Sequence, residues 1–256
     1  MTQSAALWSD AAEAGARGDY LAAWAVLDRL ADADARWQSL AASMRGSHLR
    51  QIGDVRAARE WDAQALESAT DAESRAEALI GLAADDVADA HAAAARSHLA
   101  LAADVAADHW RTRTRLAWVT AELSLLAGAP LEAVDAGERA LSACRDHSPR
   151  HVAKSLLIVE AARGTTASPA LVGEGLLRAV ELIRAGGWVS LQWPAALIAD
   201  DLVRAQRATT RLVSEAASIR AEGAAAVRAI GRALPPGLRE GWLGGPAARR
   251  LLTSDG

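Results

Sequence analysis

Apolar and small residues recur along this chain at steps of three and four, which is the spacing of one helical face. The clearest stretch runs from Trp37 to Ala69. One apolar face of its first half is formed by Leu40, Met44, Leu49 and Ile52. A second face follows at Ala58, Trp61, Ala65 and Ala69. The stretch therefore predicts two short amphipathic helices that fold back on each other.

Two glycines in this stretch have separate roles. Gly53-Asp54 predicts the turn, because glycine accepts the left-handed exit of a helix and aspartate caps the next one. Gly46 lies in mid-helix, where glycine costs about 1 kcal/mol relative to alanine. We expect a second helix to approach closely at Gly46.

The small residues and the turn of this stretch resemble the tetratricopeptide repeat. The family's small mid-helix residue, its turn and its small residues in the second helix fall on Gly46, Gly53-Asp54, Ala58 and Ala65. Thr70 stands near the place of the family's usual proline, which is a departure. The resemblance implies a right-handed α-solenoid in which the first helix of each pair faces a concave, ligand-binding groove.

Turn signals recur near positions 18, 53, 88, 128, 164 and 205, that is, every 35 to 41 residues. A period in this range indicates a helical solenoid whose pairs are stable only when stacked. No segment alternates apolar and polar residues as a strand would. We therefore predict an all-α solenoid of about six antiparallel helix pairs over residues 1–233. The whole is similar to uncharacterised helical-repeat proteins of high-GC actinobacteria, which implies no activity.

The last 23 residues, 234–256, break the pattern with Leu234-Pro235-Pro236-Gly237. This tail resembles a Leu-Pro-x-x-Leu-Arg-Glu-x-aromatic-Leu segment that follows helical-repeat domains in bacterial signalling proteins. We expect a cap in which Leu238, Trp242 and Leu243 cover the last helix face.

Several local expectations are less regular. The third turn, at Ala88-Asp89, has lost its glycine, and the fifth is lengthened over residues 164–169, with the returning helix expected from Ala170. Trp193-Pro194 is placed in the first turn of a helix. Thr209 or Thr210 is expected to cap the long helix that ends near Arg232.

Composition, charge and cysteine content add to this picture. About a quarter of the chain is alanine and phenylalanine is absent, so helices must pack closely and the tryptophans, among them Trp24, Trp37 and Trp61, are expected to fill the core. The net charge of −4 gives no field that favours nucleic acid. The single cysteine, the lack of a signal-like start and the shortness of the apolar runs predict a cytoplasmic protein without a membrane segment. Alanine-rich ends would allow a homodimer.

Catalytic patterns are scarce. His91 and His98 lie seven residues apart on one face, but the sequence offers no third ligand nearby, so half-buried or solvated histidines explain them better than a metal. Asp85-Asp86 and Asp200-Asp201 are adjacent pairs whose members point apart on a helix. We expect no enzyme activity and no cofactor.

The best binding candidates lie on the expected first helices. Arg111, Arg115, Trp118 and Glu122 form one stripe, in which Arg115 and Trp118 would clamp an extended peptide. Superposition of the repeats adds Arg75, Lys154 and Trp193 to this groove, with Arg50, Asp86 and Asp201 nearby.

Alternatives stay open at this point. The same stripe is also explained by a solvated face of arginine–glutamate pairs, with Trp118 packed against its neighbours. The favoured function is an adaptor that binds a protein or peptide in the groove. The alternative is a sensor or regulatory module of a bacterial transcription or signalling system that acts through a partner protein. An enzyme built on a helical scaffold is a third hypothesis.

Overall fold

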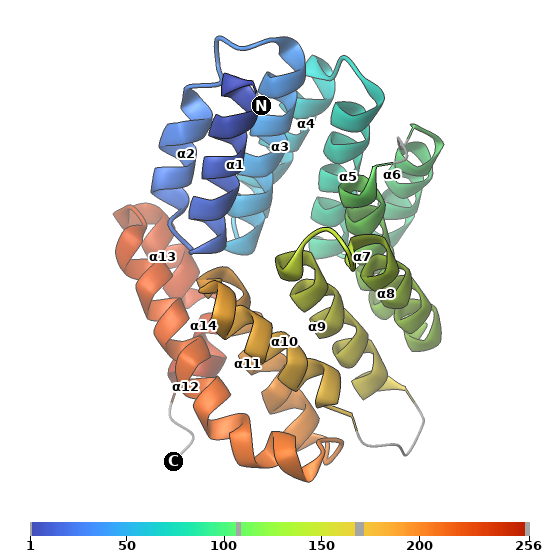
Figure 1. The fold of residues 1–256 in the computed structure, drawn as a ribbon, viewed down its shortest axis with the longest axis vertical. Coiled ribbons are helices and arrows are strands. Elements are labelled where there is room, and N and C mark those ends of the chain that lie inside the picture. Colours follow the sequence, from blue (N-terminus) through green and yellow to red (C-terminus); the bar gives the residue numbers. More distant parts are fainter. Residues whose placement is uncertain (1, 106–108, 167–171, 254–256) are drawn as a thin grey trace.

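The computed structural model describes residues 2–105, 109–166 and 172–253, and these residues form fourteen α-helices (Figure 1). In chain order the helices are α1 (Gln3–Ala16), α2 (Tyr20–Asp28), α3 (Ala35–Gln51), α4 (Val55–Ser68), α5 (Ala72–Ala88), α6 (Ala92–Val105), α7 (Trp110–Leu126), α8 (Pro130–Cys144), α9 (Pro149–Thr165), α10 (Glu174–Gly186), α11 (Val189–Arg204), α12 (Thr210–Ala233), α13 (Pro236–Gly244) and α14 (Pro246–Leu252). Over the described ranges, the only β-type pairing is an isolated bridge between Val172 and Ala208. The all-α prediction is confirmed.

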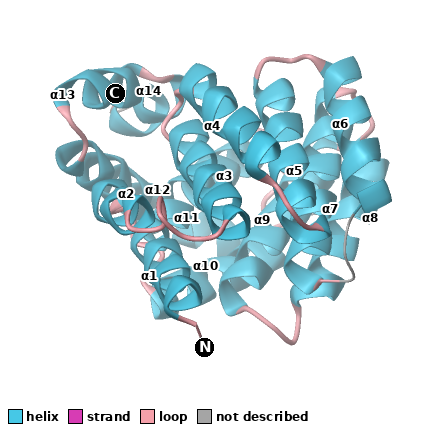
Figure 2. Cartoon of the chain, turned by 90° about the horizontal axis from the view of Figure 1, so that it is seen from above, coloured by secondary structure: helices cyan, strands magenta, loops and turns pink. Residues whose placement is uncertain are grey.

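The helices pack as consecutive pairs, α1 with α2 through α11 with α12, as predicted. Each odd-numbered helix also contacts the next odd-numbered one, from α1 and α3 to α9 and α11. We call these six odd-numbered helices the inner helices. The even-numbered partners lie outside them (Figure 2).

The series of pairs curls until its first and sixth pairs meet. Helix α11 contacts α1, and α12 contacts α2. Tyr20, Leu49 and Ile52 from the first two pairs share one hydrophobic core with Leu157 and Leu191 from the last ones. Apolar burial thus joins the two ends of the series, a contact that the repeat pattern did not predict.

The turns follow the chemistry expected of them, with one substitution. Gly18, Gly53 and Gly128 adopt positive φ, and Asp19 and Asp54 cap the helices that follow the first two of these turns. In the third turn, where glycine is missing, Ala90 takes a φ of 58°. A left-handed alanine costs roughly 1–2 kcal/mol, so the packing of α5 against α6 must hold this turn in place.

The close crossing expected at Gly46 is present. A Cβ at Gly46 would lie 2.7 Å from a carboxylate oxygen of Asp62 and 3.0 Å from the carbonyl oxygen of Ala58. Gly81 of α5 meets the same carboxylate from the other side. Two glycines on neighbouring inner helices thus make room for one buried acid on α4.

Some boundaries differ from the prediction. Helix α11 begins at Val189, after the left-handed Gly187, so Trp193 and Pro194 lie in its second turn and not in its first. Helix α9 continues to Thr165, and α10 begins at Glu174. The remainder of the lengthened fifth turn, 167–171, lies outside the described residues. Thr209 caps α12, as expected.

The C-terminal helices cover α12, as predicted for the cap. Trp242 is buried, and its indole N–H donates to the carbonyl oxygen of Val227 at 2.9 Å. Leu243 packs at Gly231. The large apolar side chains of α13 thus close the end of the series.

The tryptophans expected in the core lie at its edges. Trp24, Trp37 and Trp61 are half-buried. The guanidinium of Arg36 covers the ring of Trp37 at 4.7 Å, and that of Arg45 lies 5.7 Å from Trp24 and 4.6 Å from Trp61. Each ring therefore presents one face to the core and one to a cation.

Candidate binding site

Helix α7 carries four of the seven predicted site residues, and α9 brings Lys154 beside them. The Nζ of Lys154 lies 4.2 Å from the centre of the Trp118 ring and 4.0 Å from a carboxylate oxygen of Glu122. Trp118 itself is buried, and its indole N–H donates to the hydroxyl of Ser155 at 2.8 Å. The predicted peptide clamp would need a free indole face, whereas this indole is occupied by α9.

Glu77 of α5 is the partner of both arginines in the predicted stripe. Its side chain is 1% exposed, it forms ion pairs with Arg111 at 2.8 Å and with Arg115, and it accepts a hydrogen bond from Thr112. Burial alone would raise the pKa of Glu77, but the two arginine charges and the Thr112 hydroxyl together hold it below its usual range. Glu77 is thus an ionised buried acid that joins α5 to α7.

A second charged group lies between α3, α4 and α5. Arg50 pairs with Asp62 at 3.0 Å and with Asp85, and neither aspartate side chain is exposed. Burial raises the pKa of Asp85 to about 7 against the effect of Arg50, and the negative charge of Asp62 adds to the rise. One arginine therefore serves two acids, of which Asp85 titrates near neutral pH.

Aromatic rings connect the start of α9 to α7. His147 stacks on Trp110 at 5.1 Å between centroids, His151 meets the same ring edge-on at 5.0 Å, and His151 stacks on Trp118 at 5.2 Å. With Lys154 above Trp118, this column fills the junction of the two helices.

Arg150 is a half-buried charged side chain without an acidic partner among the described residues. Among the described residues it forms no ion pair; its Nη2 donates a long hydrogen bond of 3.4 Å to Ser190, and its buried Nε has no partner. Burial lowers the pKa of Arg150, the nearby Tyr20 opposes this, and the charges of Arg111 and Arg115 lower it further. A cation without a counterion thus lies where α9 meets the first pairs.

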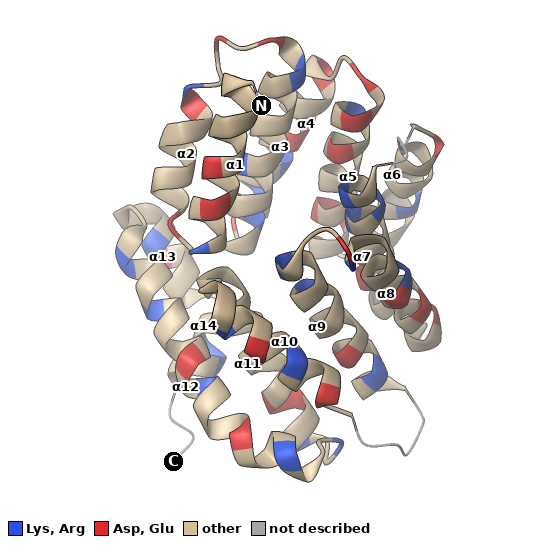
Figure 3. Cartoon of the chain, viewed as in Figure 1, with Lys and Arg blue, Asp and Glu red and all other residues tan. Residues whose placement is uncertain are grey.

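His151 shows how closely four cations gather. Its pKa is lowered to about 2, first by burial and then by the positive charges of Arg111, Arg150, Arg115 and Lys154. We call these four residues the cation cluster. Figure 3 shows basic segments at the starts of α7 and α9 and acidic ones along α5.

Lys154 is half-buried beside the ring of Trp118. About a third of its side chain, 37%, is accessible to solvent. Nevertheless, desolvation by the surrounding protein lowers its pKa to about 8, with Glu122 opposing and the charges of Arg115, Arg150 and Arg50 contributing.

The other predicted site residues lie apart from this cluster. Arg75 is exposed at the start of α5. Trp193 of α11 packs edge-on against Trp242, at 5.5 Å, and belongs to the C-terminal core. Asp86 and Asp201 were expected near the groove residues. Instead, Asp86 binds Arg59 and His98, and Asp201 binds Arg250. The adjacent aspartates Asp85 and Asp86 do point to different partners, as predicted.

Two residues at the site escaped sequence reasoning. Glu77 sits in an alanine-rich face, four residues before Gly81, and that spacing to a crossing glycine was the available signal. Arg150 follows Pro149 at a helix start, where an arginine normally reaches solvent, so no local signal marked it. Its position near Tyr20 of α2 and His48 of α3 depends on how the first pairs meet the last ones.

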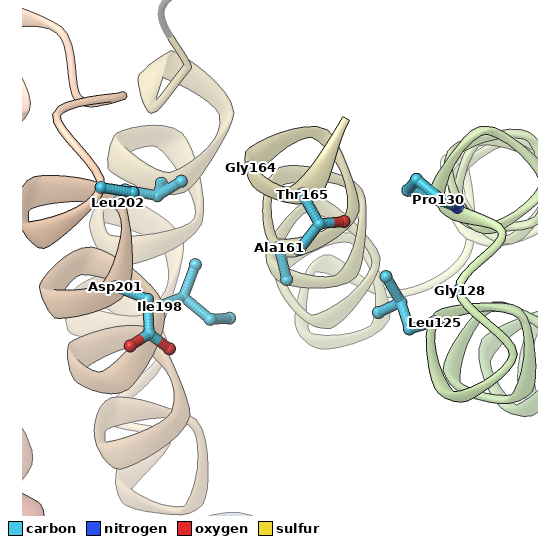
Figure 4. A pocket seen from close by; sticks show the side chains of 10 residues that line it. Leu125, Gly128, Pro130, Ala161, Gly164, Thr165, Ile198, Asp201 and Leu202 are labelled. Carbon is cyan, nitrogen blue, oxygen red and sulfur yellow. The ribbon is translucent and has the colours of Figure 1, made fainter. Parts of the chain in front are cut away.

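A separate cavity opens between the α7–α8 turn, the end of α9 and α11 (Figure 4). Its volume is about 560 Å³ and its lining is mostly apolar. The residues that line it are Leu125, Gly128, Pro130, Ala161, Gly164, Thr165, Ile198, Asp201, Leu202 and Ala205. None of the predicted binding residues lies here, and its one acid, Asp201, is paired with Arg250.

We also searched the described ranges for metal-ligand clusters and for helices that could span a membrane. His98 is engaged with Asp86 at 2.7 Å, and no cluster of three or more His, Cys, Asp or Glu side chains there could hold a metal ion. Within the same residues, none of the helices has the combined length and apolar character needed to cross a bilayer.

The fold defines the class of the protein as an all-α chain of helix pairs packed in series around buried ion pairs. No family model and no curated protein matches the chain. Its function must therefore be argued from the site itself.

Proposed function

We propose that the protein is a binding module, a right-handed, tetratricopeptide-like solenoid of about six helix pairs that holds an acidic segment of a partner protein or peptide at its inner helices. The serial packing of the pairs and the gathering of cations on α7 and α9 support this proposal. The function needs no catalysis and no cofactor, and we assign it to the cytoplasm.

One observation carries the proposal: Arg150 is half-buried with a fully buried, unpartnered Nε, and among the described residues it has no counterion, whereas Glu77 and Arg50 are paired. An unpaired buried cation is costly, by several kcal/mol in the general case. Such a cost is retained when the group serves a ligand whose negative charge is absent from the free protein. Lys154, with a pKa lowered to about 8 by desolvation, is the second group that such a ligand would stabilise.

The test is direct binding of a labelled, end-capped hexapeptide with two central glutamates, compared with its diglutamine counterpart. We expect saturable binding of the diglutamate peptide to the wild-type protein and none of the diglutamine peptide. Arg150→Gln should remove the binding, whereas Arg96→Gln, which changes an exposed arginine on the outer helix α6, should leave it intact. Equal binding of both peptides would contradict the proposal.

A regulatory module that acts through a partner protein is the second candidate. The contact of the first and sixth pairs favours it, because the cation cluster lies beside Tyr20 and His48, whose pKa values respond to Arg150. An anion at Arg150 would then change how firmly α1 and α2 are held. Hydrogen exchange of these two helices should slow when the diglutamate peptide binds, and unchanged exchange would leave only the adaptor function.

A further inference from the structure

We infer that the anionic group recognised by the cation cluster is a phosphomonoester dianion. The inference rests on the proposed function, because it names the chemistry of the same site. Its source is either a phosphorylated side chain of the partner or a free phosphorylated small molecule, and the experiment below separates the two.

The charge balance of the site favours a dianion. The four cations of the cluster face two carboxylates, Glu77 and Glu122, which leaves an excess of two positive charges. The neighbouring Arg50, Asp62 and Asp85 contribute at most one negative charge, since one arginine faces two acids there. The excess is thus one to two charges. A phosphomonoester carries about −1.5 to −2 near pH 7, whereas a carboxylate carries −1.

The available donors also exceed what a carboxylate can accept. The Nε of Arg150 is unpartnered and its Nη2 has only the 3.4 Å contact to Ser190. Lys154 is 4.0 Å from Glu122, beyond hydrogen-bond distance. A guanidinium offers five N–H donors and an ammonium three, and a phosphoryl group presents three strong acceptor oxygens. One phosphoryl group can therefore bridge Arg150 and Lys154 while leaving Glu77 to its own partners.

The side chains around the cluster are held by ring contacts. Arg111 and Arg115 expose 16% and 12% of their side chains, and the ring of Trp8 covers the guanidinium of Arg111 at 4.7 Å. Trp118 below Lys154 and His151 between the cations are held by ring stacking.

The first experiment measures thermal unfolding of the full chain with inorganic phosphate. At a phosphate concentration of about 100 Kd we expect the melting temperature to rise by roughly 5–10 °C. Phosphate also stabilises proteins by exclusion from their surfaces, so the comparison of variants decides. The rise should shrink to the excluded-salt effect in Arg150→Gln and Lys154→Gln and stay intact in Arg96→Gln. An equal rise in wild type and Arg150→Gln overturns the inference.

The pH dependence of binding then identifies the anion. The affinity for capped phosphoserine, a phosphomonoester, should increase from pH 5 to 7 as its dianion forms, with a pKa near 6, and decrease above pH 8 as Lys154 loses its proton. The groups that face Lys154 are Glu122 and Arg115 on α7, Arg50 on α3 and Arg150 on α9. Sulfate, a dianion throughout this range, should show the decrease above pH 8 without the increase between pH 5 and 7. A phosphoserine profile identical to that of sulfate contradicts selection of the phosphoryl dianion.

The last comparisons distinguish a phosphorylated partner from a phosphorylated small molecule. They also distinguish failure of this inference from failure of the proposed function. A capped hexapeptide with one central phosphoserine should bind more tightly than the diglutamate peptide by tenfold or more. Tighter binding of that peptide than of inorganic phosphate assigns the site to a phosphorylated partner, and the reverse assigns it to a small molecule. If the diglutamate peptide binds at least as well as the phosphoserine peptide, the inference fails and the proposed function stands. If no anion binds, both fail.

Discussion

Two groups of charged side chains on the inner helices, one around Glu77 and one around Arg150, differ in how their charge is balanced. Around Glu77, one ionised acid faces two arginines, a hydroxyl completes its hydrogen bonding, and its pKa is lowered. Arg150 forms no ion pair among the described residues, Lys154 lies 4.0 Å from Glu122, and the pKa values of Arg150 and Lys154 are lowered. The charges of the first group are paired within the protein, whereas Arg150 in the second group is not paired.

This difference distinguishes charges that stabilise the fold from charges that, in the proposed function, a ligand would neutralise. A buried ion pair is strongly destabilising to break, because its surviving partner keeps the desolvation cost. A buried cation with no partner already bears that cost, so its removal relieves the fold. Substitutions in the two places should therefore change stability with opposite signs.

The largest effect is expected from Glu77→Gln, which leaves Arg111 and Arg115 without their carboxylate. We expect a loss of about 3–5 kcal/mol in the free energy of unfolding, measured by denaturant titration. Glu122→Gln is the matched control, because its carboxyl is 37% exposed, and it should change stability by less than about 0.5 kcal/mol. Equal losses in the two variants would show that the burial of Glu77 has no energetic consequence.

Acid should act on the same group. Because the folded-state pKa of Glu77 lies below its unfolded value, the stability it contributes is present above the unfolded pKa and is lost as pH falls through the folded one. The acid limb of the unfolding profile should therefore be shallower in Glu77→Gln than in the wild type. An unchanged acid limb would show that Glu77 does not cause the loss of stability in acid.

Gly46→Leu tests the crossing that encloses Asp62. The added side chain would collide with the Asp62 carboxylate and the Ala58 carbonyl, which we expect to cost about 1–3 kcal/mol. Gly237→Leu is the control, since a Cβ at that position meets nothing within 4 Å. A melting temperature as high as that of the control would mean that α3 and α4 can separate without cost.

Asp85 should make stability fall as pH rises toward neutrality. Its folded pKa of about 7 lies above the unfolded value near 3.8, so the folded protein binds the proton more tightly between these values. The free energy of unfolding should decrease by up to about 1.4 kcal/mol per pH unit from pH 5 to 7. Asp85→Asn should flatten this dependence; a slope that persists in the variant would assign it to another group.

The smallest change is expected from Arg150→Gln, and it is a gain. Removing the unpaired guanidinium should raise the free energy of unfolding by roughly 0.5–2 kcal/mol in anion-free buffer. Arg96→Gln should have almost no effect. A clear loss of stability in Arg150→Gln would show that the arginine has a structural role and would undermine the comparison drawn above.

The fold was largely predictable because its signals are local. Gly18, Gly53 and Gly128 mark turns within a few residues, and Gly46 marks a crossing whatever its partner. The site was only half predictable. Arg111 and Arg115 could be placed by helical periodicity and Lys154 by superposition of the repeats, but their partners are 32 to 38 residues away. The burial of Arg150 and the contact of α1 with α11 arise from the curvature of the whole series, which no local pattern encodes.

The most direct test uses the fact that Lys154 is the single lysine of the chain. Reductive ¹³C-methylation preserves its charge and gives one side-chain NMR signal that titrates with the site. The account predicts a pKa near 8 in the free protein, against about 10.4 for an ordinary lysine, and a rise of more than one unit when phosphate is added. A pKa near 10.4 that phosphate does not move would contradict the claim that Lys154 and Arg150 wait for an anion.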